Sequence, residues 1–156
     1  MERIALFPGS FDPFTIGHES IVRRALPLFD KIIIAIGINT LKKSLISPEN
    51  RVKMISDVFI KEKRVEVTSF QGLTVDFCKN VGAQYLLRGL RTAADFEYER
   101  AIGQMNKAMK PEIESIFLLT STEYTPINST IVRDIIMYGG DATKFLPKGI
   151  DIRKYL

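Results

Sequence analysis

The chain has few of the residues from which disulfides and metal centres are built. It contains one cysteine, Cys78, and one histidine, His18, among its 156 residues. A single cysteine cannot form an internal disulfide, which fits a reducing compartment, so we expect a cytoplasmic protein. Because no group of Cys, His and Asp has the spacing of metal ligands, we expect no metal site built from side chains.

Long hydrophobic segments are also missing. The sequence has no run of about 18 apolar residues, so we expect no membrane span. The first residues, Met-Glu-Arg-Ile-Ala, lack the basic and then apolar pattern of a signal peptide. The 22 basic and 18 acidic residues leave a net charge of +4, without a dense basic stripe. This charge suits an anionic small-molecule substrate and does not indicate nucleic-acid binding.

Common phosphate and nucleophile motifs are absent as well. There is no Gly-x-x-x-x-Gly-Lys-Ser/Thr loop and no Gly-x-Gly-x-x-Gly fingerprint, and Ser10 is not part of a Gly-x-Ser-x-Gly elbow. A phosphate-directed site must therefore consist of histidine, lysine and arginine side chains. Such a set suits phosphoryl or nucleotidyl transfer, in which the enzyme mainly positions the reactants and stabilises charge. A phosphate nucleophile is already ionised at neutral pH and needs no general base.

Segments typical of strands and helices alternate along the chain. The β-branched run at 31–37 is typical of a strand covered on both faces. We predict strands at 3–7, 31–37, 64–70, 84–87 and 115–119. We predict a first helix after residue 15, with an apolar face that extends to Phe29, and a second helix from Ser47 onward. Further helices are predicted at 75–81, 92–109 and 129–138, with short helical turns in 141–156.

Five strands interleaved with helices predict an α/β fold, namely a doubly wound, five-stranded parallel sheet with helices on both faces. No linker, repeat or low-complexity tract interrupts the chain, so we expect one domain over 1–156. Ligands of such sheets bind at the carboxyl ends of the strands. The residues that follow each predicted strand are therefore the candidates for a site.

The segment 6–18 passes from the first predicted strand through a Gly- and Pro-rich loop to a helix N-terminus. Free backbone N–H groups and the helix dipole make such a turn a natural anion site, and His18 adds a donor that can also carry charge. Lys42 follows the second strand, Arg88 and Arg91 follow the fourth, and Ser129 and Thr130 follow the fifth. These cations and small polar groups should gather at one edge of the sheet.

Two blocks of sequence carry a resemblance to a known family. Residues 9–18, Gly-Ser-Phe-Asp-Pro-Phe-Thr-Ile-Gly-His, resemble the nucleotidyltransferases with a His-x-Gly-His signature, with Thr15 in place of the first histidine. Residues 88–99, Arg-Gly-Leu-Arg to Asp-Phe-Glu-Tyr-Glu, are similar to bacterial phosphopantetheine adenylyltransferases. Lys42-Lys43, Met105-Asn106 and 128–130 match the same family, over essentially the whole chain. The resemblance implies a Rossmann-like nucleotidyltransferase fold.

The resemblance also implies a reaction. The 4′-phosphate of phosphopantetheine would attack the α-phosphate of ATP, giving dephospho-coenzyme A and pyrophosphate in the penultimate step of coenzyme A synthesis. His18, Lys42 and Arg91 would form the catalytic set. Phosphopantetheine would bind to Ser10, Lys42, Thr74 and Arg88. ATP would bind to Ser10, Phe11, His18, Gly89, Leu90, Arg91, Glu99, Tyr124, Thr125, Pro126, Ile127, Asn128, Ser129 and Thr130.

The family also suggests ligands and an assembly. Mg²⁺ would accompany ATP through phosphate oxygens and water, without protein ligands. Coenzyme A would be a possible feedback inhibitor, and the chain would form a homohexamer. Four positions depart from the family pattern: Ser10 replaces a common Thr, Asn128 stands where Ser is usual, Tyr124 replaces a frequent Trp, and Met137 replaces a basic residue of some members. The affinity for coenzyme A is therefore left open.

Other interpretations of the same residues stay open at this point. A related enzyme could transfer an adenylyl or cytidylyl group to nicotinate mononucleotide or glycerol phosphate, or the chain could sense a nucleotide without chemistry. Structural roles compete at single positions. Arg88 could pair with Asp95 or Glu99, Ser129 could be a helix N-cap, and Asp12 could stabilise its own turn. Cys78, in an apolar helix, is expected in the core rather than as a reactive thiol.

Overall fold

A computed structural model describes all residues from Met1 to Leu156. Its elements run in the order β1 (Ile4–Gly9), α1 (Ile16–Ala25), η1 (Leu26–Leu28), β2 (Lys31–Gly37), α2 (Pro48–Val58), β3 (Val65–Phe70), α3 (Thr74–Asn80), β4 (Tyr85–Leu90), α4 (Ala93–Met109), β5 (Glu114–Leu119), η2 (Thr122–Tyr124), α5 (Ser129–Met137), η3 (Thr143–Phe145) and η4 (Ile152–Lys154). No helix is long and apolar enough to cross a membrane.

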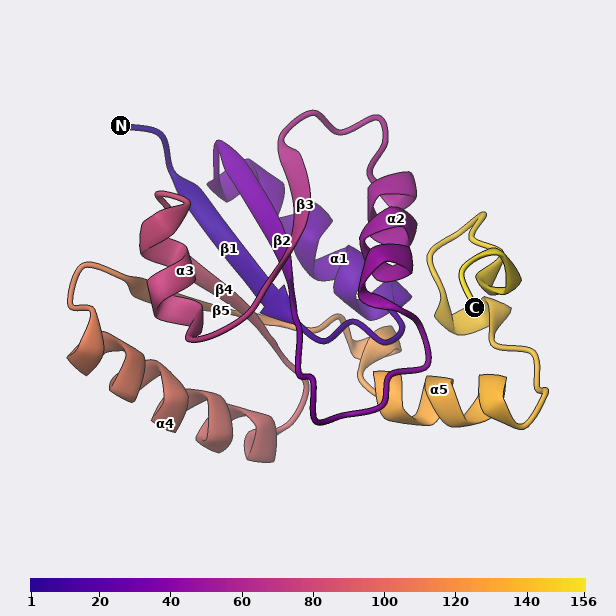
Figure 1. Cartoon of the computed structure of the whole chain (residues 1–156). Coiled ribbons are helices and arrows are strands. Elements are labelled where there is room, and N and C mark those ends of the chain that lie inside the picture. Colours follow the sequence, from indigo (N-terminus) through magenta and orange to yellow (C-terminus); the bar gives the residue numbers. More distant parts are fainter.

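The five strands form one parallel sheet, as predicted, and the structure adds their order, β3-β2-β1-β4-β5. Helices cover both faces, with α3 and α4 on one side and α1, α2 and α5 on the other (Figure 1). The chain moves outward from β1 in one direction and then returns to place β4 on its other side. The strand order therefore reverses next to β1, where ligands of such sheets bind.

Two apolar clusters hold the helices to the sheet, because side chains alternate between the faces of each strand. In β2, Ile32, Ile34 and Ile36 belong to the larger cluster with α1 and α2, whereas Ile33 and Ala35 belong to the smaller one. Cys78 lies in the smaller cluster, and burial raises the pKa of its thiol to about 12. A neutral core thiol at this position matches the prediction.

Several boundaries differ from the sequence prediction: β1, for example, ends at Gly9 and not at residue 7, and two further differences change where a residue lies. The fourth strand continues to Leu90 instead of ending at residue 87, because β5 offers ladder partners up to Leu119. Arg88 therefore lies within a strand and not after it. The first helix ends at Ala25, and Pro27 follows in a 3-10 turn, so Phe29 packs in the core from an extended segment rather than from a helical face.

Two glycines allow close approaches beside the end of β1. A Cβ on Gly9 would lie 2.8 Å from the ring of Phe11, and a Cβ on Gly89 would lie 3.1 Å from Ile21 Cγ1. Phe11 itself has a φ of 49°, in the left-handed region. The ring of Phe11 can thus fold back over β1 only because residue 9 has no side chain.

Candidate active site

A cavity of about 870 Å³ lies at the carboxyl ends of the central strands. Most residues that the sequence placed in a site line it, although they come from distant segments. They are Ser10, Phe11, His18, Lys42, Arg88, Gly89, Arg91, Glu99, Ile127, Asn128, Ser129 and Thr130. Six Lys and Arg side chains line the cavity against three carboxylates, so its charge favours an anionic ligand.

Thr74 lies elsewhere, in a second cavity of about 240 Å³. Ser10, Arg88 and Glu99 line both cavities, so the two spaces meet at these residues. The remaining expected nucleotide contacts, Leu90, Tyr124, Thr125 and Pro126, line neither cavity. Leu90 is buried in the core, and Tyr124 lies beside Gly17 at the start of α1.

The His18 ring is held as a neutral hydrogen-bond donor. The backbone N–H of Thr15 donates to His18 Nδ1 over 3.0 Å, so Nδ1 is an acceptor and the ring proton resides on Nε2. Burial, together with the charges of Arg88 and Arg91, lowers the pKa of His18 from 6.5 to about 3. In the protein without bound phosphates the neutral imidazole is therefore strongly favoured, and His18 is a hydrogen-bond donor.

Arg88 is fixed in a set orientation by two other elements. Its Nε and Nη2 donate to the two carboxylate oxygens of Glu99 over 2.9 and 2.6 Å, and its Nη1 donates to the carbonyl of Pro8 over 2.6 Å. Of the two pairings considered, the structure has the one with Glu99. Both carboxylate oxygens of Glu99 thus accept from Arg88. One hydrogen on each terminal nitrogen of Arg88 remains available to a ligand.

The two other expected cations differ in how firmly they are held. Arg91 forms an ion pair with Asp95, with Nε and Oδ2 3.2 Å apart, at the start of α4. Lys42 is exposed on the loop after β2, where its backbone N–H donates to Asn39. No ion pair holds the Lys42 side chain, so it can adjust to a bound anion.

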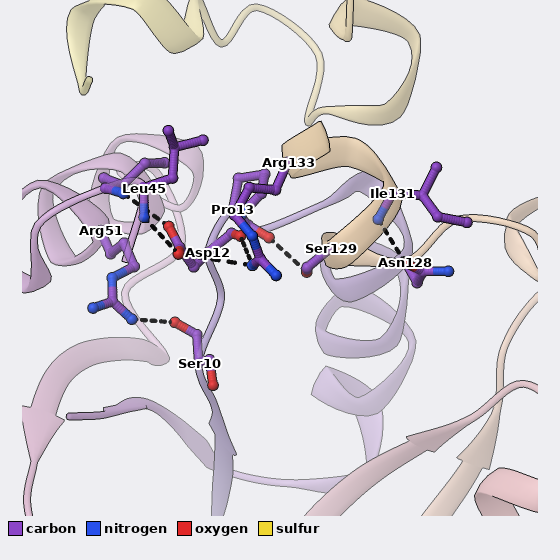
Figure 2. A network of polar contacts seen from close by, with 10 residues as sticks. Ser10, Asp12, Pro13, Leu45, Arg51, Asn128, Ser129, Ile131 and Arg133 are labelled. Atoms are coloured by element: carbon purple, nitrogen blue, oxygen red, sulfur yellow. Dashed lines mark hydrogen bonds and ion pairs between the residues drawn. The ribbon is translucent and has the colours of Figure 1, made fainter. Parts of the chain in front are cut away.

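The N-terminus of α5 opens into the cavity, but its cap differs from the prediction. Asn128, not Ser129, is the N-cap, and its Oδ1 accepts from the N–H of Ile131 over 2.9 Å. The hydroxyl of Ser129 donates to the carbonyl of Pro13 instead (Figure 2). The backbone N–H groups of Ser129 and Thr130 have no acceptor in the chain and are suited to an anion.

Asp12 connects the first loop to distant segments. Its buried carboxylate accepts from the backbone N–H groups of Leu45 and Ile46 over 2.8 and 2.9 Å (Figure 2). Arg133 donates to the Asp12 carbonyl over 2.8 Å, and its Nη1 lies 3.7 Å from Oδ2. The prediction that Asp12 stabilises its own turn is wrong, because its carboxylate oxygens bind backbone N–H groups of the loop that carries Lys42.

Two arginines at the cavity escaped the sequence prediction. Arg51, on α2, donates to the carbonyl of Ser10, and Arg133, on α5, donates to Asp12. The sequence does carry a signal for Arg51: it lies four residues before Ile55 and is therefore on the apolar face of the same helix. An arginine on a buried helix face requires a partner. Nothing in the local pattern singled out Arg133.

Comparisons with known proteins find a family and relatives that match most of the chain. Residues 6–135 match the cytidylyltransferase-like family. The chain is 50% identical to the phosphopantetheine adenylyltransferase of Flavobacterium psychrophilum, over 97% of this chain and 99% of the relative. It is 52% identical to the phosphopantetheine adenylyltransferase of Cytophaga hutchinsonii, over 94% and 98% of the two chains.

A solved structure supports the fold. The crystal structure of a protein from Vibrio parahaemolyticus, provisionally named a nicotinate-nucleotide adenylyltransferase, superposes with a TM-score of 0.68 at 18% identity, over 94% of each chain. At this identity the likeness concerns the fold alone. With the family match and the close relatives over nearly the whole chain, the conclusion is that this chain belongs to the phosphopantetheine adenylyltransferase family.

Proposed function

We propose that the protein transfers the adenylyl group of ATP to 4′-phosphopantetheine, which yields dephospho-coenzyme A and pyrophosphate. The observation that carries the proposal is the meeting of the neutral Nε2–H donor of His18 with Lys42, Arg88 and Arg91 at one cavity. The names of the close relatives identify the same reaction. Each of these four side chains is suited to bind or stabilise phosphate, and none is needed as a base.

The chemistry is an in-line substitution at the α-phosphorus. An oxygen of the phosphopantetheine phosphate forms the new bond to the α-phosphorus. The bond from the α-phosphorus to the oxygen that bridges the α- and β-phosphates breaks, and this oxygen keeps the electron pair and leaves as part of pyrophosphate. His18 donates to a non-bridging α-phosphate oxygen, where negative charge grows in the transition state. Lys42 and Arg91 neutralise the phosphates, and the free N–H groups at the start of α5 hold the leaving group.

The phosphopantetheine substrate spans the two cavities in this proposal. Arg88 lies where they meet and binds the reacting phosphate with its two free hydrogens. The pantetheine arm extends into the smaller cavity, past the backbone of Thr74. Ser10, at the same junction, contacts both substrates, and Phe11, Gly89 and residues 127–130 contact the nucleotide.

ATP enters as its Mg²⁺ complex. The three carboxylates at the cavity are engaged already: Asp12 by backbone N–H groups, Asp95 by Arg91 and Glu99 by Arg88. The donor set thus fits a metal ion that is carried by phosphate oxygens and water rather than by a protein cage. Mg²⁺ would neutralise phosphate charge while the chain orients the two substrates.

Product analysis tests the proposed reaction directly. The purified protein is mixed with Mg²⁺, ATP and phosphopantetheine, and pyrophosphate and dephospho-coenzyme A are measured together. Both should appear in equal amounts. Turnover only with nicotinate mononucleotide or with CTP would contradict the acceptor or donor assignment. Binding of ATP with no pyrophosphate released from any acceptor would indicate a nucleotide sensor instead.

Replacing Arg88 by alanine should raise the KM for phosphopantetheine by about 10- to 100-fold, with a much smaller change for ATP. The lost charged hydrogen bonds are worth about 1.5–3 kcal/mol each. Initial rates at varied concentrations of each substrate measure the two KM values. Arg100→Ala, on the solvent-exposed side of α4, is the control, and an equal loss for both substrates would refute the assignment of Arg88.

We also propose that the chain forms a homohexamer in the cytoplasm and that coenzyme A inhibits it. Support for assembly comes from α4, where Phe96, Tyr98, Met105 and Met109 are 43%, 69%, 64% and 46% exposed. Such a cluster on one helix is typical of an interface. Light scattering should give six times the 17.7 kDa mass of the chain, and a monomeric mass would refute assembly.

A further inference from the structure

Arg51 is a buried arginine at the edge of the main cavity. It is 5% exposed, and its Nη1 donates to the carbonyl oxygen of Ser10 over 2.6 Å (Figure 2). Its Nε is buried and has no hydrogen-bond partner. The one hydrogen bond of the Arg51 side chain is therefore to the backbone of the loop after β1, which the proposed function places next to the reacting phosphates.

The charge of Arg51 is less compensated than that of any other arginine at the cavity. Arg88, Arg91 and Arg133 each have a carboxylate oxygen within 4.0 Å, on Glu99, Asp95 and Asp12. No carboxylate lies that close to Arg51, and desolvation lowers its pKa, although the charges of Asp12 and Glu49 act from farther away in the opposite direction. A buried cation without an acidic partner is costly unless it serves a ligand or a backbone geometry that the protein requires.

The bond from Arg51 sets the direction of a free backbone donor. The peptide bond from Ser10 to Phe11 is trans, so its C=O and N–H point in opposite directions. Because Arg51 holds the Ser10 carbonyl, the Phe11 N–H points away from α2. This N–H has no acceptor in the chain, and Phe11 lines the main cavity.

The helix that carries Arg51 is itself held from the end of the chain. Asn50 Nδ2 donates to the Tyr155 carbonyl over 3.0 Å, and the Tyr155 hydroxyl donates to Asp57 over 2.6 Å. Both contacts belong to α2, one near each end. Arg51 therefore projects from a helix whose position along the sheet is restrained, as a positioning residue requires.

We propose that Arg51 is a positioning residue for the adenylyl transfer: it holds the Ser10–Phe11 peptide so that the Phe11 N–H donates to the reacting phosphate. The inference rests on the proposed function for its substrates, but it concerns a residue to which that function assigns no substrate contact. The hydrogen bond from the Phe11 N–H strengthens as negative charge develops on the phosphate in the transition state. Loss of Arg51 should therefore lower kcat more than it changes either KM.

The test compares Arg51→Met and Arg51→Lys with the wild type. Methionine keeps much of the side chain's volume and removes the donor and the charge, whereas lysine keeps the charge and one donor. We expect Arg51→Met to lower kcat by about 10- to 30-fold, with both KM values within about threefold of wild type, since one oriented donor is lost. Arg51→Lys should recover a substantial part of kcat. Lys53→Met, on the exposed side of the same helix, is the control for charge.

The outcomes separate this inference from the proposed function. If Arg51→Met is folded and keeps kcat within threefold, or if only KM changes, the role of Arg51 is overturned. If Arg51→Met does not fold, Arg51→Lys decides. A kcat below that of the wild type at unchanged KM values supports the role of Arg51, whereas a wild-type kcat, or a change in KM alone, overturns it. If the wild type accepts nicotinate mononucleotide but not phosphopantetheine, the proposed function fails and the same comparison is made with that acceptor. A wild type that turns over neither acceptor overturns both.

Discussion

Replacing His18 by alanine is expected to lower kcat by about 10² to 10³, while the Kd for ATP changes by less than about threefold. The neutral ring presents one N–H, on Nε2, because Nδ1 accepts from Thr15. A fixed donor aimed at an oxygen that gains charge contributes most in the transition state and little in the ground state. Steady-state kinetics give kcat, and calorimetry with an unreactive ATP analogue gives the Kd.

Two amide variants separate the donor from the ring. Glutamine can place an N–H near the position of Nε2, whereas asparagine reaches only the position of Nδ1. His18→Gln should therefore retain more activity than His18→Asn, although both keep a polar side chain. Equal losses in the two variants, or near-normal turnover in His18→Ala, would rule out the proposed role.

The lowered pKa of His18 can be measured with unusual clarity, since the chain has a single histidine. Its imidazole resonance should show no titration step between pH 5 and 8, because the folded pKa is about 3. The unfolded ring takes up a proton near pH 6.5, so stability falls as the pH drops from 6.5 towards 3. Bound ATP acts in the opposite direction, because its negative charge favours the imidazolium. A step near 6.5 in the free protein would contradict this account.

Replacing Asp12 by alanine is expected to lower the free energy of unfolding by about 3–5 kcal/mol. The carboxylate is 5% exposed and accepts from two backbone N–H groups, those of Leu45 and Ile46. Its removal leaves both donors without an acceptor and Arg133 without its acidic neighbour. Urea denaturation, followed by circular dichroism, measures the loss from the shift of the midpoint.

An asparagine at residue 12 and a surface aspartate provide the controls. Asp12→Asn keeps the shape but only one oxygen, so it should fall between wild type and alanine. Asp30→Ala removes an exposed carboxylate that pairs with Arg3, and its midpoint should move far less. A wild-type midpoint in Asp12→Ala would show that the loop at 45–46 is held by other contacts.

Local pattern was sufficient for the sheet and for the ends of most helices, but not for contacts made across the chain. The isoleucine run of β2 predicts a strand covered on both faces, and the structure has one. The end of β4 depends on pairing with β5, which no local pattern contains. The cap of α5 was missed for a similar reason. Asn128 and Ser129 are both good N-caps, and the choice is decided by the bond from Ser129 to Pro13.

The candidate site shows the same division. The sequence placed His18, Lys42, Arg88 and Arg91 after or beside strands, and the parallel sheet brings them to one cavity. Glu99 was predicted to contact the nucleotide, and the structure adds a contact that no local pattern contains, the pairing of both its oxygens with Arg88. Arg51 depends on a carbonyl 41 residues away, so its partner could be identified only from the three-dimensional structure.

The order of the strands also bears on how the protein is made. The first three strands are neighbours in the sheet and are complete by Phe70, together with α1 and α2. During synthesis this half can assemble while β4 and β5 are still untranslated. Tyr155, which holds α2, is added 85 residues after Phe70. The nascent chain can thus pair its first three strands early, whereas the restraint that Tyr155 places on α2 forms only after the strands of the second half have been made.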